Sequence, residues 1–152
     1  MGRRTRRYAL SDTAQQVVGG FLLAGPFVVT EEVWVLAHNM SLLQLAFTVA
    51  IVLAVGYGAL YRADEDRDPD RERSFLGVPL RYVSLLLVAY LSVFLLAVAF
   101  AAPETFVGDV AGESVVVSGR SVNLGRVVVT VKAVSVGALF SVIGAATADS
   151  IY

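Results

Sequence analysis

The chain has 152 residues, of which 57% are hydrophobic and 16% are charged, whereas soluble domains average about 25% charged residues. Its formal net charge of −1 argues against a nucleic-acid-binding protein. With no cysteine and one histidine, His38, the chain has no disulfide, thiolate metal site or cysteine nucleophile, and no pair of histidines to hold a haem. Eleven of the twelve basic residues are arginine and residues 64–72 are strongly acidic, a bias that suits a halophilic archaeon.

The first long apolar segment covers residues 14–37. It exceeds the roughly 20 residues that cross a bilayer core, and we expect a helix because lipid offers no partner for free backbone groups. Asp12 followed by Gln15 predicts an N-cap with its N3 partner, and Pro26 predicts a kink. A signal peptide is the alternative, since arginines precede this segment, but the polar SDTAQQ insert and the Glu31–Glu32 pair argue against it.

Three further apolar segments follow, at residues 42–61, 80–102 and 127–148. The valine-rich start of the last one would suit a strand in water, but its length favours a helix. A soluble helical bundle would need a polar face with a period of 3.6 residues, which the second and third segments lack. The sequence therefore predicts an all-α, multi-pass protein of the cell membrane, with four transmembrane helices in a single domain.

The distribution of arginine predicts the topology. An even number of spans places the N-terminal arm and the loop 62–79 on one side, and the loop 103–126 on the other. The first side, counted to the start of the third segment, has nine basic residues against two. Because basic loops stay inside, both termini are predicted to be cytoplasmic. The nine are Arg3, Arg4, Arg6, Arg7, Arg62, Arg67, Arg71, Arg73 and Arg81, and the two are Arg120 and Arg126.

Small residues recur at every fourth position in three segments, and such stripes let helix backbones approach closely. Chance is the alternative in helices so rich in alanine and glycine. We predict contact seams, either with helices of the same chain or with a neighbouring copy, and a homo-oligomer because four helices make a small bundle. The stripes are Gly20 and Ala24, then Ala46, Ala50, Ala54 and Gly58, and then Ala133, Gly137, Ser141 and Ala145, with Asp149 next in register.

The loops carry weaker signals. The acidic alternation in residues 62–74 resembles an EF-hand loop, but Pro69 replaces its glycine and Phe75 its final glutamate, so we expect a solvated loop. Asn39-Met40-Ser41 fits a glycosylation sequon, although the turn lies very close to the membrane. In the loop 103–126, the stretch VVVSGRSVNL predicts a short hairpin or a surface cap.

Glu31 and Glu32 lie in an apolar stretch, and Lys132 is expected at a similar depth in the fourth segment. Charges at membrane depth usually face protein or water and have a partner. One interpretation is a structural pair of Lys132 with one glutamate. Adjacent helical residues point about 100° apart, so a second carboxylate would remain free. We expect Glu31 to pair with Lys132 and Glu32, beside Trp34, to be functional, as an acidic ring in an oligomer or as a carrier residue.

The stretch VVGGFLLAGPFVVTEEVWVLA, residues 17–37, has a glycine-rich start, a proline and an acid–Val–Trp element, formed by Gly19, Gly20, Pro26, Glu32, Val33 and Trp34. It resembles an uncharacterised family of small archaeal and cyanobacterial integral membrane proteins, which supports the membrane fold and implies no activity.

The functional prediction is an oligomeric cation channel or small transporter that is embedded in the lipid bilayer and has an acidic outer site. The alternative is a membrane scaffold or accessory subunit. We expect no cofactor and no enzymatic activity, the one enzymatic alternative being a serine–lysine hydrolase that uses Lys132. The sequence leaves open whether a metal binds.

Overall fold

The computed structural model describes residues 10–62 and 74–151. The arginines of the N-terminal arm, nearly all of the acidic loop 62–74 and Tyr152 lie outside these ranges. The helices are α1 (Leu10–Val28), α2 (Glu31–Asn39), α3 (Leu42–Tyr57), the π-helical turn η1 (Gly58–Arg62), α4 (Leu80–Ala99), α5 (Ala102–Val107) and α6 (Leu124–Ile151). Two hairpins, β1–β2 (Ser74–Phe75 and Val78–Pro79) and β3–β4 (Ser114–Val117 and Arg120–Asn123), complete the fold.

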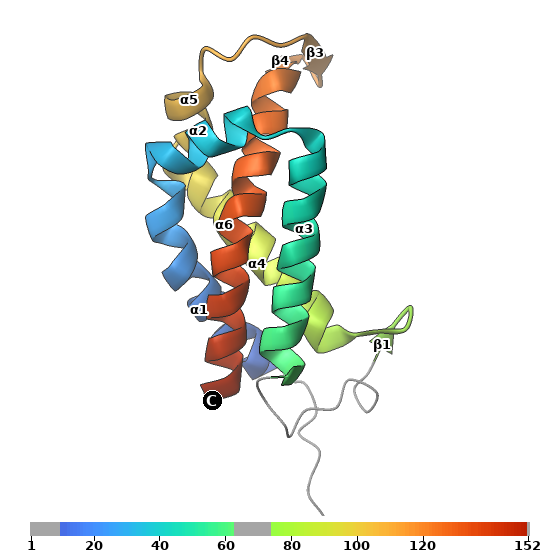
Figure 1. Ribbon diagram of the computed structural model, residues 1–152. Coiled ribbons are helices and arrows are strands. Elements are labelled where there is room, and N and C mark those ends of the chain that lie inside the picture. Colours follow the sequence, from blue (N-terminus) through green and yellow to red (C-terminus); the bar gives the residue numbers. More distant parts are fainter. Residues whose placement is uncertain (1–9, 63–73, 152) are drawn as a thin grey trace, which may run out of the picture.

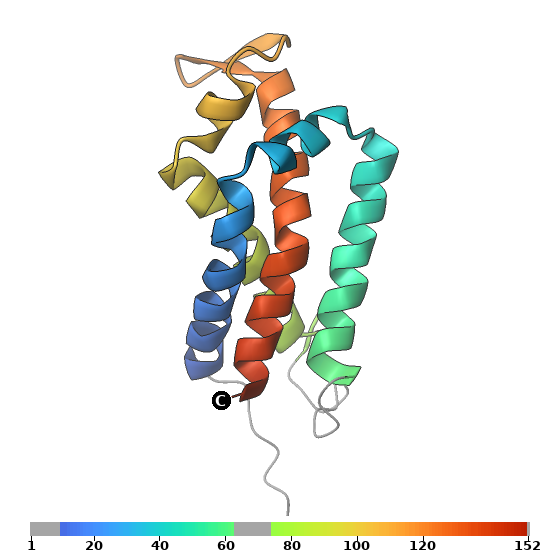
Figure 2. The same ribbon diagram turned by 60° about the vertical axis from the view of Figure 1, so that its left-hand side comes forward.

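The long helices form a bundle around α6 (Figure 1). Helix α6 packs against α1, α3 and α4 along its length, and α2 crosses it near one end. Both views place α6 between α1 and α3, with α4 behind (Figure 2). We call the end where α1 begins and α6 finishes the terminal end, and the opposite end, which carries α2, α5 and β3–β4, the hairpin end. The chain thus crosses the bundle four times, along α1, α3, α4 and α6.

Three helical stretches are long and apolar enough to cross a membrane: Leu42–Tyr61, Leu80–Ala99 and Leu124–Asp149. They agree with the predicted second, third and fourth segments to within about three residues at each end. The fold is mostly helical, which is compatible with the all-α prediction, and the predicted number of spans is reached if α1 and α2 together count as one.

The predicted first span, residues 14–37, is not one helix. Helix α1 continues through Pro26 to Val28, and α2 begins at Glu31 after a bend of 81°. The break therefore follows Pro26 by one turn. Pro26 has no N–H to give to the preceding turn, which weakens the helix there. Across the bend, the hydroxyl of Thr30 donates to the Phe27 carbonyl at 3.0 Å. As a result, α2 lies across the hairpin end of the bundle (Figure 2).

The small-residue stripe of α6 faces the inside of the bundle. All its members are buried, and a side chain on Gly137 would lie 2.7 Å from Val93 of α4. The closest contact between two helix backbones involves a glycine of α6, Gly144, that is not part of the predicted stripe. Gly144 of α6 and Gly19 of α1 meet backbone to backbone, so that a β-carbon on either would overlap the other's carbonyl group. Gly20 likewise faces α4 and α6.

The stripe on α3 faces away from the bundle. Ala46, Ala50 and Ala54 are exposed, and a β-carbon added to Gly58 would meet none of the described residues within 4 Å. Helix α3 buries only Val52 and Gly56 along its length. The two stripes therefore differ: the one on α6 packs inside the bundle, and the alanines of the one on α3 are exposed.

The stretch VVVSGRSVNL forms the predicted hairpin. Strands β3 and β4 pair Val117 with Arg120, and the turn residues Ser118 and Gly119 have φ angles of 50° and 78°. Positive φ at both turn positions is the geometry of a two-residue hairpin loop that follows the twist of its strands. Asn123 ends the hairpin and starts α6, because its side-chain oxygen accepts from the Arg126 backbone N–H at 3.1 Å.

Candidate functional site

Glu31 and Glu32 occupy the first turn of α2, and both side chains are exposed. A helix N-terminus carries a partial positive charge that favours carboxylates there. The glutamate pair therefore has a local structural explanation, since it starts a new helix where the chain turns across the bundle. Neither carboxylate lies in the interior of a continuous span, where the sequence had placed them.

Trp34 fixes the start of α2 against α1 and α5. Its indole Nε1 donates to the Val28 carbonyl, the last of α1, at 3.0 Å. Its ring stacks on Phe106 of α5, with centroids 5.9 Å apart and planes 21° apart. Only 2% of Trp34 is exposed. The hydrogen bond satisfies a carbonyl that the end of α1 leaves without a helical partner, so Trp34 holds the bend in place.

Lys132 fixes the other end of α2. Its ammonium donates to the carbonyl of Met40, the C-cap residue of that helix. A cation is favoured there because the last carbonyls of a helix carry partial negative charge. Lys132 forms no ion pair with Glu31 or Glu32 in the part of the chain that the structure describes. The predicted Glu31–Lys132 pair is therefore wrong, and neither glutamate is paired with Lys132.

A polar cavity of about 470 Å³ lies between α2 and α5. Three acidic residues line it: Glu31 from α2, Glu104 from α5, and Asp109 from the loop after α5. His38 and Trp34 also contribute to its wall, whereas Glu32 does not. Glu31, which the sequence analysis paired with Lys132, is thus the glutamate that lines the cavity.

The acidic residues that line the cavity do not form a metal-chelating cluster. Among residues 10–62 and 74–151, no three His, Asp or Glu side chains are close enough to share a metal ion. The acidic side chains can still attract a cation through the summed field of their charges. Arg126 brings a positive charge close to the cavity, because it donates to the carbonyl of Gly108, which also lines the cavity.

A second polar cluster lies at the terminal end and was not predicted from the sequence. Arg81 of α4 donates to both carboxylate oxygens of Asp149, at 3.1 and 3.0 Å, and to Asp12 at 3.1 Å. It ties together α1, α4 and α6. Asp12 is therefore an ion-pair partner in the first turn of α1, which begins at Leu10, and the predicted N-cap is wrong. Two features of the sequence could have indicated this cluster. Arg81 lies at the start of an apolar segment, and Asp149 is in register with the small-residue stripe of the last segment.

The polar contacts continue from this cluster into the bundle. Ser84 of α4 donates to the side-chain carbonyl of Gln16 at 2.8 Å, and the Thr13 hydroxyl lies 3.5 Å from that of Ser84. One turn further along α1, Ser141 of α6 donates to the Gly20 carbonyl at 3.0 Å. These groups follow the line where α1, α4 and α6 meet, which we call the α1–α4–α6 seam.

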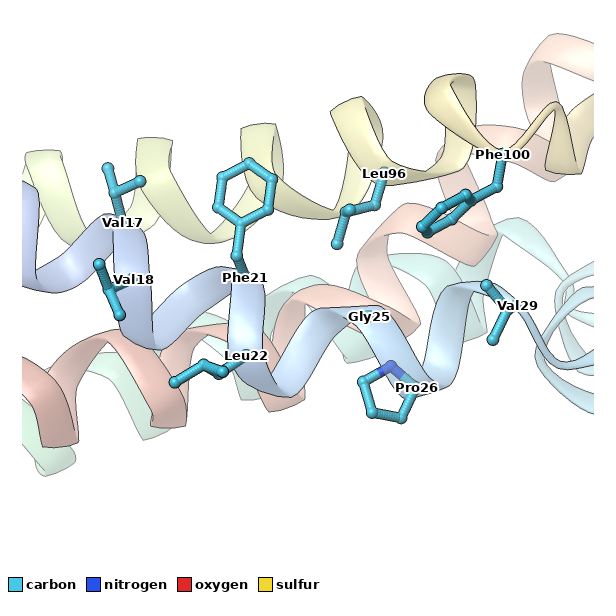
Figure 3. A pocket seen from close by; sticks show the side chains of 9 residues that line it. All are labelled: Val17, Val18, Phe21, Leu22, Gly25, Pro26, Val29, Leu96 and Phe100. Carbon is cyan, nitrogen blue, oxygen red and sulfur yellow. The ribbon is translucent and has the colours of Figure 1, made fainter.

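An apolar groove of about 650 Å³ lies between α1 and α4 (Figure 3). Phe21 and Leu96 project into it, and Phe100 covers one end (Figure 3). All nine lining residues are apolar or glycine. A binding pocket normally places a few polar groups to orient its ligand, and this groove has none.

No protein-family model, curated protein or solved structure matches this chain.

Proposed function

We propose that the chain is an integral protein of the cell membrane that transports a small cation, which it takes up in the cavity between α2 and α5. The observation that carries the proposal is the place of Glu31, which is exposed, unpaired with Lys132, and shares the cavity with Glu104 and Asp109. If Lys132 neutralised Glu31 inside the protein, the same residues would form only a structural pair.

The membrane part of the proposal rests on the apolar helices and on the side on which each loop lies. The start of α1, the end of α6 and the hairpin β1–β2 share the terminal end, to which the arginine-rich segments are attached. By the arginine count, that end is cytoplasmic. The cavity is at the other end, so it would receive its cation from outside the cell.

The proposal includes an oligomer. Beneath the cavity, the bundle is filled by an apolar cluster that includes Trp34, Val107 and Val129. A path for a cation through one protomer would require this cluster to open, whereas a path between copies would not. The exposed alanine stripe of α3 provides a face on which helices of two copies could approach closely.

A scaffold or accessory subunit is the second candidate, and the same α3 face favours it. Exposed alanines at positions 46, 50 and 54 would bind a helix of another protein as well as a copy of this one. The two candidates differ in whether Glu31 has a task. Transport requires its charge, and a scaffold built on α3 does not.

The experiment is cation flux into liposomes containing the purified protein, compared with Glu31→Gln and Glu32→Gln. The two changes are chemically identical, affect neighbouring exposed residues, and differ in which one reaches the cavity. We expect flux above that of empty liposomes for the wild type and for Glu32→Gln, and a large loss for Glu31→Gln with folding unchanged.

Two results would count against transport. If the wild type moves no monovalent, divalent or organic cation above background, the scaffold candidate is preferred. If Glu32→Gln loses flux as completely as Glu31→Gln, the carboxylates act through the charge of the first turn of α2, and the cavity is not the site of uptake.

A further inference from the structure

Gln16 has a buried polar atom that lacks a partner. Its side chain is fully buried where α1 packs against α4 and α6. The side-chain carbonyl accepts from Ser84, but the amide nitrogen Nε2 has no hydrogen-bond partner among the described residues. Buried polar groups in folded proteins are nearly always hydrogen-bonded, to protein or to ordered water. The missing partner therefore points to a bound molecule.

The chemistry of the amide selects the class of molecule. An amide nitrogen donates only, so a cation cannot satisfy it. An anion would lie close to the two carboxylates that already share Arg81 at the terminal end. Water both donates and accepts, so it also satisfies the side chain if the oxygen and nitrogen of the amide are exchanged.

The surroundings supply further partners. The hydroxyls of Thr13 and Ser84 lie one turn or less away on α1 and α4. On the other side, Gly20 has no side chain, and a β-carbon there would lie 3.1 Å from the hydroxyls of both Ser92 and Ser141. Buried waters typically make two to four hydrogen bonds to such groups.

We propose that the α1–α4–α6 seam binds an ordered water molecule at the amide nitrogen of Gln16. This water extends the polar contacts from the charged cluster of Asp12, Arg81 and Asp149 toward the Ser141–Gly20 hydrogen bond. It makes the seam a hydrated line inside the bundle. The inference is independent of the cation proposal, which concerns the opposite end of the molecule.

The test is solid-state NMR of the protein in lipid bilayers, with magnetisation transferred from water to N–H groups. The chain has only three glutamines, Gln15, Gln16 and Gln44, so their side-chain signals are few. Those of Gln16 are assigned by their loss in Gln16→Met. Gln44 is exposed and serves as the hydrated control, and the backbone N–H of Val142, fully buried inside α6, serves as the dry control.

We expect transfer from water to the Gln16 amide to be several-fold stronger than to the Val142 backbone N–H. It should fall in Ser84→Val, which removes a hydroxyl from the seam and adds apolar volume, while the Gln44 signal stays constant. Transfer to Gln16 as weak as to the Val142 backbone N–H would show a dry amide and overturn the proposal. If Ser84→Val does not fold, the comparison of Gln16 with Val142 in the wild type still decides.

Discussion

Replacing Arg81 with methionine should be among the most destabilising single changes in this chain. Arg81 is 4% exposed, and its partner Asp149 has a side chain with no exposed surface, while that of Asp12 is 18% exposed. Removing the arginine leaves a buried carboxylate without its cation, a change that typically costs about 3–5 kcal/mol. At about 2–4 °C per kcal/mol for a chain of this size, the melting temperature should fall by about 6–20 °C.

The assay is thermal unfolding in detergent, followed by the fluorescence of Trp34. Arg120→Met is the matched control, because Arg120 is exposed in the β3–β4 hairpin and should shift stability by no more than about 0.5 kcal/mol. Adding Asp149→Asn to Arg81→Met should recover much of the loss, since it removes the stranded charge. A loss below about 1 kcal/mol for Arg81→Met, or no recovery in the double variant, would refute the reasoning that this cluster ties the three helices together.

Two further predictions follow from the packing, and a third follows from the proposed topology. Gly144→Ala should cost about 1–3 kcal/mol of unfolding free energy, because its β-carbon would overlap the backbone of α1. Gly58→Ala should cost nothing, because its β-carbon would meet none of the described residues within 4 Å. Equal effects of the two changes in thermal unfolding would contradict the close crossing of α1 and α6. Lys132→Met should cost about 1–2 kcal/mol because the Met40 carbonyl loses its donor, and a neutral result would remove the role of Lys132 at the end of α2. Reporter fusions at the C-terminus and at Gly112 should report opposite sides of the membrane, and the same side for both would exclude the proposed topology.

The sequence predicted those parts of the fold that depend on local composition. Segments 42–61 and 80–102 are largely helical, as the length of their apolar runs predicted. The hairpin at Ser118–Gly119 was predictable because glycine readily adopts the positive φ of such a turn. The spacing of Gly137 and Ser141 predicted a packed face, but spacing cannot tell an inner face from an outer one, and the stripe on α3 proved to be outer.

The bend between α1 and α2 was hidden by composition. Thr30 followed by Glu31 and Glu32 is a helix start, yet the apolar residues on both sides kept the segment hydrophobic enough to resemble one span. The partners of Lys132 and Arg81 depended on tertiary structure. Lys132 binds a backbone carbonyl, which no residue type reveals. Asp12 and Asp149 lie at least 68 residues from Arg81 in sequence, so only the folded bundle brings the three together.

Cation binding at the cavity between α2 and α5 is tested most directly by titrating the protein in detergent with mono- and divalent metal ions and with small organic ammonium ions, while recording tryptophan fluorescence. Trp34 is the only tryptophan and lines the cavity, so the signal reports from the site itself. The expected result is a saturable change with at least one cation, strongly weakened in Glu31→Gln and retained in Glu32→Gln. A fluorescence that no cation changes, or a titration that Glu31→Gln leaves as it is, would contradict a cation site at Glu31.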